Sequence, residues 1–161
     1  MAARIPPVPR LLGWAGVSPQ AAACLAVYFV MPEWRVAAMG AALAYAALIF
    51  TFLGGTWWGM AATAPAAEGR GALGWVWVAA IVPSLVSFAA LAAVVFGVAL
   101  PGFEPLASSL LVLGGIIGAS ALVDSALSPG GPVGIAPQWW PRLRWPLSLA
   151  LGSLTMVAGL G

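Results

Sequence analysis

The chain has 161 residues, of which 63% are hydrophobic and only 6% are charged, with six basic residues against four acids. An ordinary soluble domain is about 25% charged, so these few charged side chains cannot cover a water-exposed surface. The composition therefore excludes a soluble protein and predicts an integral membrane protein. The basic residues, all arginines, are scattered along the chain, which excludes nucleic acid as a partner.

Five apolar runs follow one another along the chain, and together they contain a single charged residue. A bilayer core about 30 Å thick needs about 20 apolar residues per helix, and each run comes close to that length or exceeds it. The sequence therefore predicts an all-α integral membrane protein, a bundle of five transmembrane helices that forms a single domain over residues 1–161. The predicted helices cover residues 11–31, 36–60, 74–98, 106–127 and 145–160.

The arginines are distributed unevenly between the two sides of such a bundle. Five helices place the N-terminus and alternate loops on one side, and short loops rich in arginine stay in the cytoplasm. We therefore expect a protein of the bacterial inner (cytoplasmic) membrane with a cytoplasmic N-terminus. The arginines on the cytoplasmic side are then Arg4, Arg10, Arg70, Arg142 and Arg144, and Arg35 lies on the other side.

A segment rich in glycine and tryptophan ends the second predicted helix. Gly55 and Gly59 are four residues apart, so they share a helix face and allow a neighbouring backbone to come close. On one interpretation the segment is a packing surface that ends in a tryptophan belt. On the other, the glycines open a slot in which a flat apolar ligand stacks on an aromatic ring. The candidate residues for helix contact or ligand contact are Gly54, Gly55, Trp57, Trp58 and Gly59.

Asp124 is the only acid inside an apolar run. A carboxylate within a membrane is costly, so by default it indicates a functional residue. Because Asp124 lies about one turn from its helix end, it can also form a structural ion pair with Arg142 or Arg144. Ligand contact or protonation remains the alternative. Trp139, in the loop that precedes the last helix, suits either headgroup binding or membrane anchoring.

Side chains for catalysis are scarce. The chain has no histidine, and Cys24 is its only cysteine, so the usual general base and metal-ligand clusters are missing. We therefore predict a protein that is not an enzyme, with no metal site and no cofactor.

The order of several motifs resembles one family. Ala44-Tyr45-Ala46 precedes Phe52-Leu53-Gly54-Gly55 and Trp58-Gly59, and later come Asp124, then Pro137, Trp139 and Trp140, then Leu143 and Arg144. This order is similar to that of the transmembrane protein 69 family, a bacterial and mitochondrial domain of unknown function. The family often has histidine or a basic residue before the Trp-Gly pair, where this chain has Trp57. The resemblance supports a fold of membrane helices and implies no established activity.

Two functions remain open from the sequence. The first is a non-enzymatic accessory or assembly subunit, which packs in the lipid bilayer against other membrane-protein subunits or against itself. The alternative is a small binder or transporter of a hydrophobic ligand, namely a lipid, a quinone or a tetrapyrrole, close to Trp57, Trp58 and Asp124.

Overall fold

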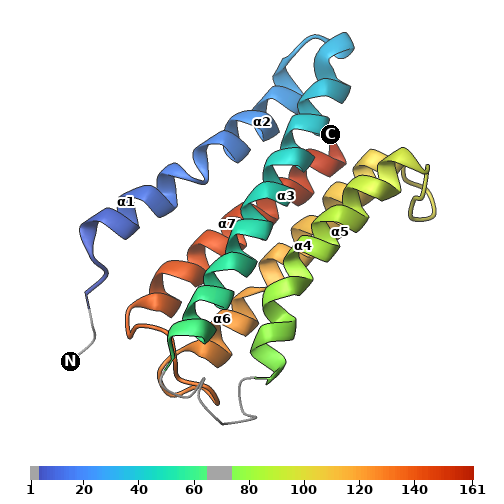
Figure 1. Cartoon of the computed structure of the whole chain (residues 1–161). Coiled ribbons are helices and arrows are strands. Elements are labelled where there is room, and N and C mark those ends of the chain that lie inside the picture. Colours follow the sequence, from blue (N-terminus) through green and yellow to red (C-terminus); the bar gives the residue numbers. More distant parts are fainter. Residues whose placement is uncertain (1–3, 65–73) are drawn as a thin grey trace.

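The computed structural model describes residues 4–64 and 74–161, and within these ranges it contains helices and no strand. The helices lie side by side as a bundle, with the N-terminus at one end and the C-terminus at the other (Figure 1). In chain order they are α1 (Pro7–Ala15), α2 (Ser18–Phe29), α3 (Pro32–Thr63), α4 (Gly74–Val95), α5 (Pro105–Ala119), α6 (Ala121–Leu127) and α7 (Trp140–Leu160).

Five helical stretches are long and apolar enough to cross a membrane. This confirms the predicted all-α fold with five membrane helices. Two of the stretches contain a break, because α1 and α2 form the first together and α5 and α6 form the fourth. The stretches are Pro7–Phe29, Pro32–Thr63, Gly74–Val95, Pro105–Leu127 and Trp140–Leu160.

Several helix boundaries differ from the prediction. The last helix begins at Trp140 instead of residue 145, because Pro141 lies in the first turn, where a helix needs no N–H donor. The third stretch ends at Val95 instead of residue 98. There Gly97 adopts a positive φ of 69°, and the N–H of Val98 donates to the carbonyl of Ala93, a common way to end a helix.

The break between α1 and α2 has a local cause. Pro19 lacks the N–H that would donate to the carbonyl of Ala15, and the hydroxyl of Ser18 donates to that carbonyl at 2.7 Å instead. The hydroxyl of Tyr45 on α3 donates to the carbonyl of Gly16 at 2.6 Å. The break is thus satisfied locally and fastened to the neighbouring helix.

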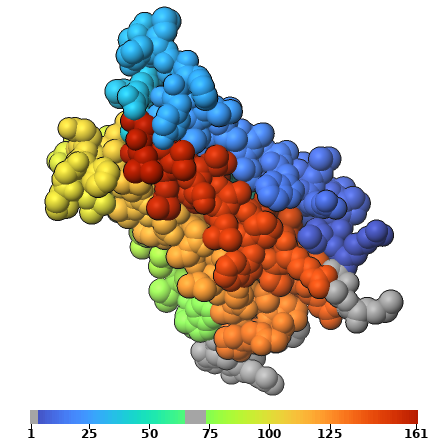
Figure 2. Space-filling view, turned by 180° about the vertical axis from the view of Figure 1, so that it is seen from behind, coloured from blue at the N-terminus to red at the C-terminus, as the bar shows by residue number. Residues whose placement is uncertain are grey.

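The helix α7 packs against α5 on one side and against α1 and α2 on the other, as the view from behind shows (Figure 2). The approach of α5 and α7 is closest at two glycines. A Cβ atom on Gly114 would lie 2.7 Å from the carbonyl oxygen of Gly152, and one on Gly152 would lie 2.8 Å from the nitrogen of Gly118. The pair Gly114 and Gly118 on α5 therefore receives Gly152 of α7 in a small-residue contact.

A second close contact joins α3 and α4. A Cβ atom on Gly54 would collide with the carbonyl oxygen of Ala80 and lie 3.2 Å from the Pro83 ring. Further along the same pair of helices, the hydroxyl of Ser87 donates to the carbonyl of Ala47 at 3.1 Å. Small residues and one interhelical hydrogen bond therefore hold α4 against α3.

Replacing Gly114 with alanine should separate α5 from α7 and lower the free energy of unfolding by about 1–3 kcal/mol, the usual cost of overpacking. The matched control is Gly115→Ala on the same helix, where no described atom lies within 4 Å of the added Cβ. That control should be neutral or stabilising by up to about 1 kcal/mol, because alanine favours a helix. Unfolding in detergent micelles measures both, and equal effects of the two variants would contradict the contact.

Candidate functional site

Asp124 lies on α6 with 0% of its side chain exposed. Its Oδ1 atom accepts hydrogen bonds from the indole Nε1 of Trp57 and from that of Trp140, each at 2.9 Å. Its Oδ2 atom accepts from Nε of Arg144 at 3.2 Å, which is also an ion pair. We call Trp57, Asp124, Trp140 and Arg144 the Asp124 cluster.

Three helices bring the cluster together. Trp57 is buried on α3, and Trp140 and Arg144 lie four residues apart at the start of α7, so they share a helix face. The guanidinium carbon of Arg144 lies 5.7 Å from the Trp140 ring centroid, within range of a cation–π contact. The Ser128 hydroxyl donates to the Asp124 carbonyl at 2.7 Å, just after α6 ends. The cluster therefore ties α3, α6 and α7 together at one end of the bundle.

The chemistry of the donors points to a structural role. A buried carboxylate costs several kcal/mol unless it is paired and hydrogen-bonded, and hydrogen bonds to a charged group contribute about 1.5–3 kcal/mol each. An indole N–H only donates, and a guanidinium does not release its proton in proteins. The partners of Asp124 therefore hold its charge in place and supply no proton acceptor.

The structure brings together three of the residues singled out from the sequence, Trp57, Asp124 and Arg144, and the expected ion pair is present. Trp140 is the member that sequence reasoning missed. Trp139 lies outside the cluster and contacts the Trp140 ring at a centroid distance of 6.0 Å. Trp58 is half-exposed and meets Trp77 of α4 edge to face at 4.7 Å. Trp58 and Trp139 therefore donate no hydrogen bond to Asp124.

The three candidate glycines on α3 face different surroundings. Gly54 is buried against α4. Gly55 and Gly59 are exposed, and no described residue places an atom within 4 Å of a Cβ built on either. The packing surface inside the bundle therefore lies at Gly54, and the face that the four-residue spacing predicts points outwards.

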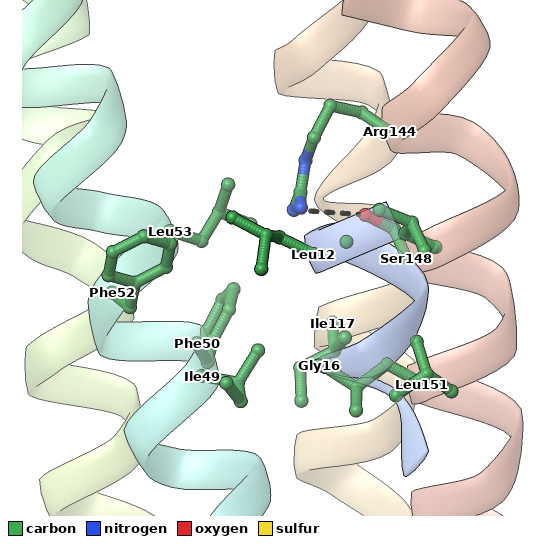
Figure 3. A pocket seen from close by; sticks show the side chains of 13 residues that line it. Leu12, Gly16, Ile49, Phe50, Phe52, Leu53, Ile117, Arg144, Ser148 and Leu151 are labelled. Atoms are coloured by element: carbon green, nitrogen blue, oxygen red, sulfur yellow. Dashed lines mark hydrogen bonds between the residues drawn. The ribbon is translucent and has the colours of Figure 1, made fainter. Parts of the chain in front are cut away.

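A cavity of about 120 Å³ lies beside Arg144, between α1, α3 and α7. Figure 3 shows the Arg144 side chain reaching into the space between α3 and α7, where its Nη2 atom donates to the Ser148 hydroxyl at 3.4 Å. The remaining wall is apolar, and Phe50, Leu53 and Leu151 are among its residues. The cavity thus combines hydrophobic walls with one polar corner, the general character of small-molecule sites.

A larger hollow of about 270 Å³ lies beside Trp57, between α3, α4 and α5. Phe50, Pro83 and Ile116 are among its lining residues, and the indole N–H of Trp57 is already given to Asp124. The hollow is thus the nearest counterpart of the slot that the sequence suggested, but its wall is almost wholly apolar.

A second buried polar contact joins α2 to α7. The side-chain amide of Gln20 donates to the hydroxyl of Thr155 at 3.0 Å, and both side chains are 0% exposed. The Gln20 Oε1 atom has no hydrogen-bond partner in the described part of the chain. Sequence reasoning passed over this pair, although an amide inside the first apolar run was a visible signal.

Comparison with known proteins places this architecture in a family. Residues 5–160 match the family described as "Protein of unknown function (DUF3429)". The chain belongs to the DUF3429 family. Neither the curated proteins nor the solved structures yielded a match. The residues described here contain no group of three histidine, cysteine, aspartate or glutamate side chains that could hold a metal ion.

In this DUF3429 protein, Trp57→Phe should lower the free energy of unfolding by about 1.5–3 kcal/mol, because it removes one donor to a buried charge. The neighbouring substitution Trp58→Phe removes no hydrogen bond to Asp124 and keeps an aromatic ring against Trp77, so it should cost less than about 1 kcal/mol. Denaturant unfolding in micelles compares the two. A cost for Trp58→Phe as large as that for Trp57→Phe would contradict the role of the indole donor.

Proposed function

We propose that this DUF3429 protein is a non-enzymatic accessory or assembly subunit, which packs through the outer face of α3 against a transmembrane helix of another protein. The observation that supports it is the exposure of Gly55 and Gly59, which lie one helical turn apart and face away from the bundle. We call this surface the α3 outer face.

Glycine is costly within a helix and so needs a reason. A glycine in a helix interior is about 1 kcal/mol less favourable than alanine. Packing inside the bundle explains the glycines at positions 54 and 114, since a Cβ on Gly54 or Gly114 would collide with a neighbouring helix. Gly55 and Gly59 have no such contact within the described chain. Their missing side chains suit a close approach from outside, as in small-residue contacts between membrane helices.

The state of the buried acid supports a role without catalysis. The Asp124 carboxylate accepts three hydrogen bonds and is 0% exposed. A general acid or base must reach the proton that it transfers. Both oxygens of the Asp124 carboxylate accept hydrogen bonds from protein donors, which favours a structural role over a reactive one.

The distribution of charge supports a cytoplasmic N-terminus in a bacterial inner membrane. The N-terminus and the α6–α7 connection lie at one end of the bundle, whereas the α2–α3 and α4–α5 connections lie at the other (Figure 1). Arg10 and Arg144 belong to the first end, and Glu33, Arg35 and Glu104 to the second, whereas Arg70 is outside the described residues. This matches the positive-inside rule, which labelling of introduced cysteines from each side would check.

We also propose that the chain belongs to a narrower group, the transmembrane protein 69 family. The motifs that carry the resemblance include Asp124, Trp140 and Arg144, and these are members of the Asp124 cluster. Proteins that share the order of these motifs have the residues needed to form the same Asp124 cluster.

Leucine at both Gly55 and Gly59 should disrupt association, because the added side chains keep a partner helix at a distance. Gly115→Leu is the matched control, since Gly115 is also an exposed glycine with no described atom near its Cβ. Gentle extraction from native membranes followed by native gel electrophoresis should show a larger complex for the wild type and the control, and its loss in the double variant.

Two outcomes would contradict this proposal. A wild-type protein that runs as a lone monomer, with no co-purifying protein, would rule out the accessory role. A complex made only of copies of this chain would show that the α3 outer face serves self-association.

A further inference from the structure

Some N–H groups of the Arg144 guanidinium form no hydrogen bond within the described chain. Within the described chain its Nε atom donates to Asp124 and its Nη2 atom makes a long 3.4 Å contact with Ser148. A guanidinium carries five N–H groups, and the Arg144 side chain, which is 17% exposed, lines the cavity of about 120 Å³. A ligand in that cavity therefore meets N–H donors that the described protein groups do not use.

The charge of the site determines the kind of acceptor. Asp124 already neutralises Arg144 at a distance of 3.2 Å, so the pair carries no net charge. A fully anionic ligand would add an uncompensated charge in an apolar surrounding, which is costly. A neutral acceptor gains the hydrogen bond without that cost, and a carbonyl oxygen is the common neutral acceptor in lipid-soluble molecules.

The size of the cavity limits what enters it. An engineered cavity of about 150 Å³ in another protein holds benzene, so about 120 Å³ accommodates a single ring or a short stretch of acyl chain. A tetrapyrrole is far larger than this. The remainder of a long ligand must lie outside the cavity.

The cavity opens towards the bilayer, where the rest of a long ligand can lie. Leu12 on α1 and Phe52 on α3 both line the cavity and are 64% and 69% exposed, and Figure 3 places Phe52 on the α3 side with Leu12 in front of the cavity. An apolar tail that leaves between them reaches the bilayer. We infer that this cavity binds the carbonyl-bearing head of a lipid-soluble molecule, with the carbonyl oxygen accepting from the Arg144 guanidinium and the tail in the membrane.

Two sources share this chemistry, the ring carbonyl of a quinone and the ester carbonyl of a phospholipid. Three probes separate them in protein purified in an alkyl maltoside, a detergent without carbonyl groups. They are a decyl-substituted 1,4-benzoquinone, the zwitterionic lipid dioleoyl phosphatidylcholine, and decylbenzene, which keeps the ring and the tail but has no carbonyl. Titration followed by native mass spectrometry measures how many molecules of each probe are bound and how tightly.

The variants test the site without removing the partner of Asp124. Ile49→Phe fills the cavity, because Ile49 lines it and is not a member of the Asp124 cluster. Leu48→Phe is the matched control, since Leu48 is 69% exposed and points away from the cavity. Arg144→Lys keeps a positive charge beside Asp124 but removes the planar fork of donors. Unfolding curves verify that each variant is folded.

The inference expects one saturable site for the benzoquinone or for the phospholipid, with decylbenzene at least about tenfold weaker. Ile49→Phe should abolish the site and Leu48→Phe should keep it. Arg144→Lys should weaken binding by about tenfold or more, the usual effect of losing a hydrogen bond to a charged group. Binding by the benzoquinone alone identifies a quinone-type ligand, and binding by the phospholipid alone identifies a lipid ester.

Equal binding of decylbenzene and the carbonyl probes would overturn the inference, because the carbonyl would then contribute nothing. Unchanged affinity in folded Ile49→Phe would equally overturn it. Neither result depends on the α3 outer face, so the accessory role stands or fails separately.

Discussion

A carboxylate with no exposed surface sits where the fourth membrane-spanning stretch ends, and it needs donors from elsewhere in the chain. Left alone, its burial would cost several kcal/mol. Trp57, Trp140 and Arg144 supply those donors from α3 and α7. The hydrogen bonds to Asp124 therefore constrain the axial position of α3 and α7 relative to α6 and the rotation of each helix about its axis.

The rotation of α3 has consequences on both of its faces. Residues in a helix are about 100° apart, so turning Trp57 towards Asp124 brings Gly54, three residues earlier, to nearly the same inner face. Gly55 and Gly59 are two residues away on either side, about 160° from Trp57, and so they point outwards. The packing of Gly54 against α4 and the outward position of Gly55 and Gly59 thus both fit the rotation of α3 that the hydrogen bond between Trp57 and Asp124 requires.

The face of α7 that carries Arg144 also organises the rest of the bundle. Ser148 and Gly152 follow at intervals of four residues, and Gly152 meets the backbone of α5. Thr155 then accepts from Gln20 of α2 near the opposite end. The buried side of α7 therefore contains a charged contact, a close glycine contact and an amide contact. The cavity beside Arg144 lies where α1, α3 and α7 meet.

The parts of this arrangement that follow from the cost of burying groups in lipid could be predicted from the sequence. The lengths of the apolar runs gave the five membrane helices, and an acid in such a run had to find a cation, which is Arg144. The predicted start of the last helix at residue 145 was wrong, because the residues before it were predicted to form a loop, whereas Pro141 lies in the first turn of α7. Because the predicted helix began after Trp140 and Arg144, their four-residue spacing did not indicate that they share a helix face.

The orientation of the α3 glycines could not be predicted for a different reason. Spacing shows that Gly55 and Gly59 share a face, but it does not show whether that face meets another part of the same chain. The hydrogen bond from Trp57 to Asp124 and the contact of Gly54 with α4 show the rotation of α3, and an indole donor is not recognisable as such in a sequence with nine tryptophans.

The most direct measurement of the central claim is a double-mutant cycle on Asp124 and Arg144. It uses Asp124→Asn, Arg144→Met and the double variant, with the free energy of unfolding measured in micelles. Breaking a buried ion pair from one side typically costs about 3–5 kcal/mol, whereas replacing both partners costs far less. We expect the double variant to lose at least about 1.5 kcal/mol less than the sum of the two single losses, well beyond the error of additivity. Strictly additive losses would show that Asp124 and Arg144 act independently, and would contradict the claim that the Asp124 cluster holds the bundle together.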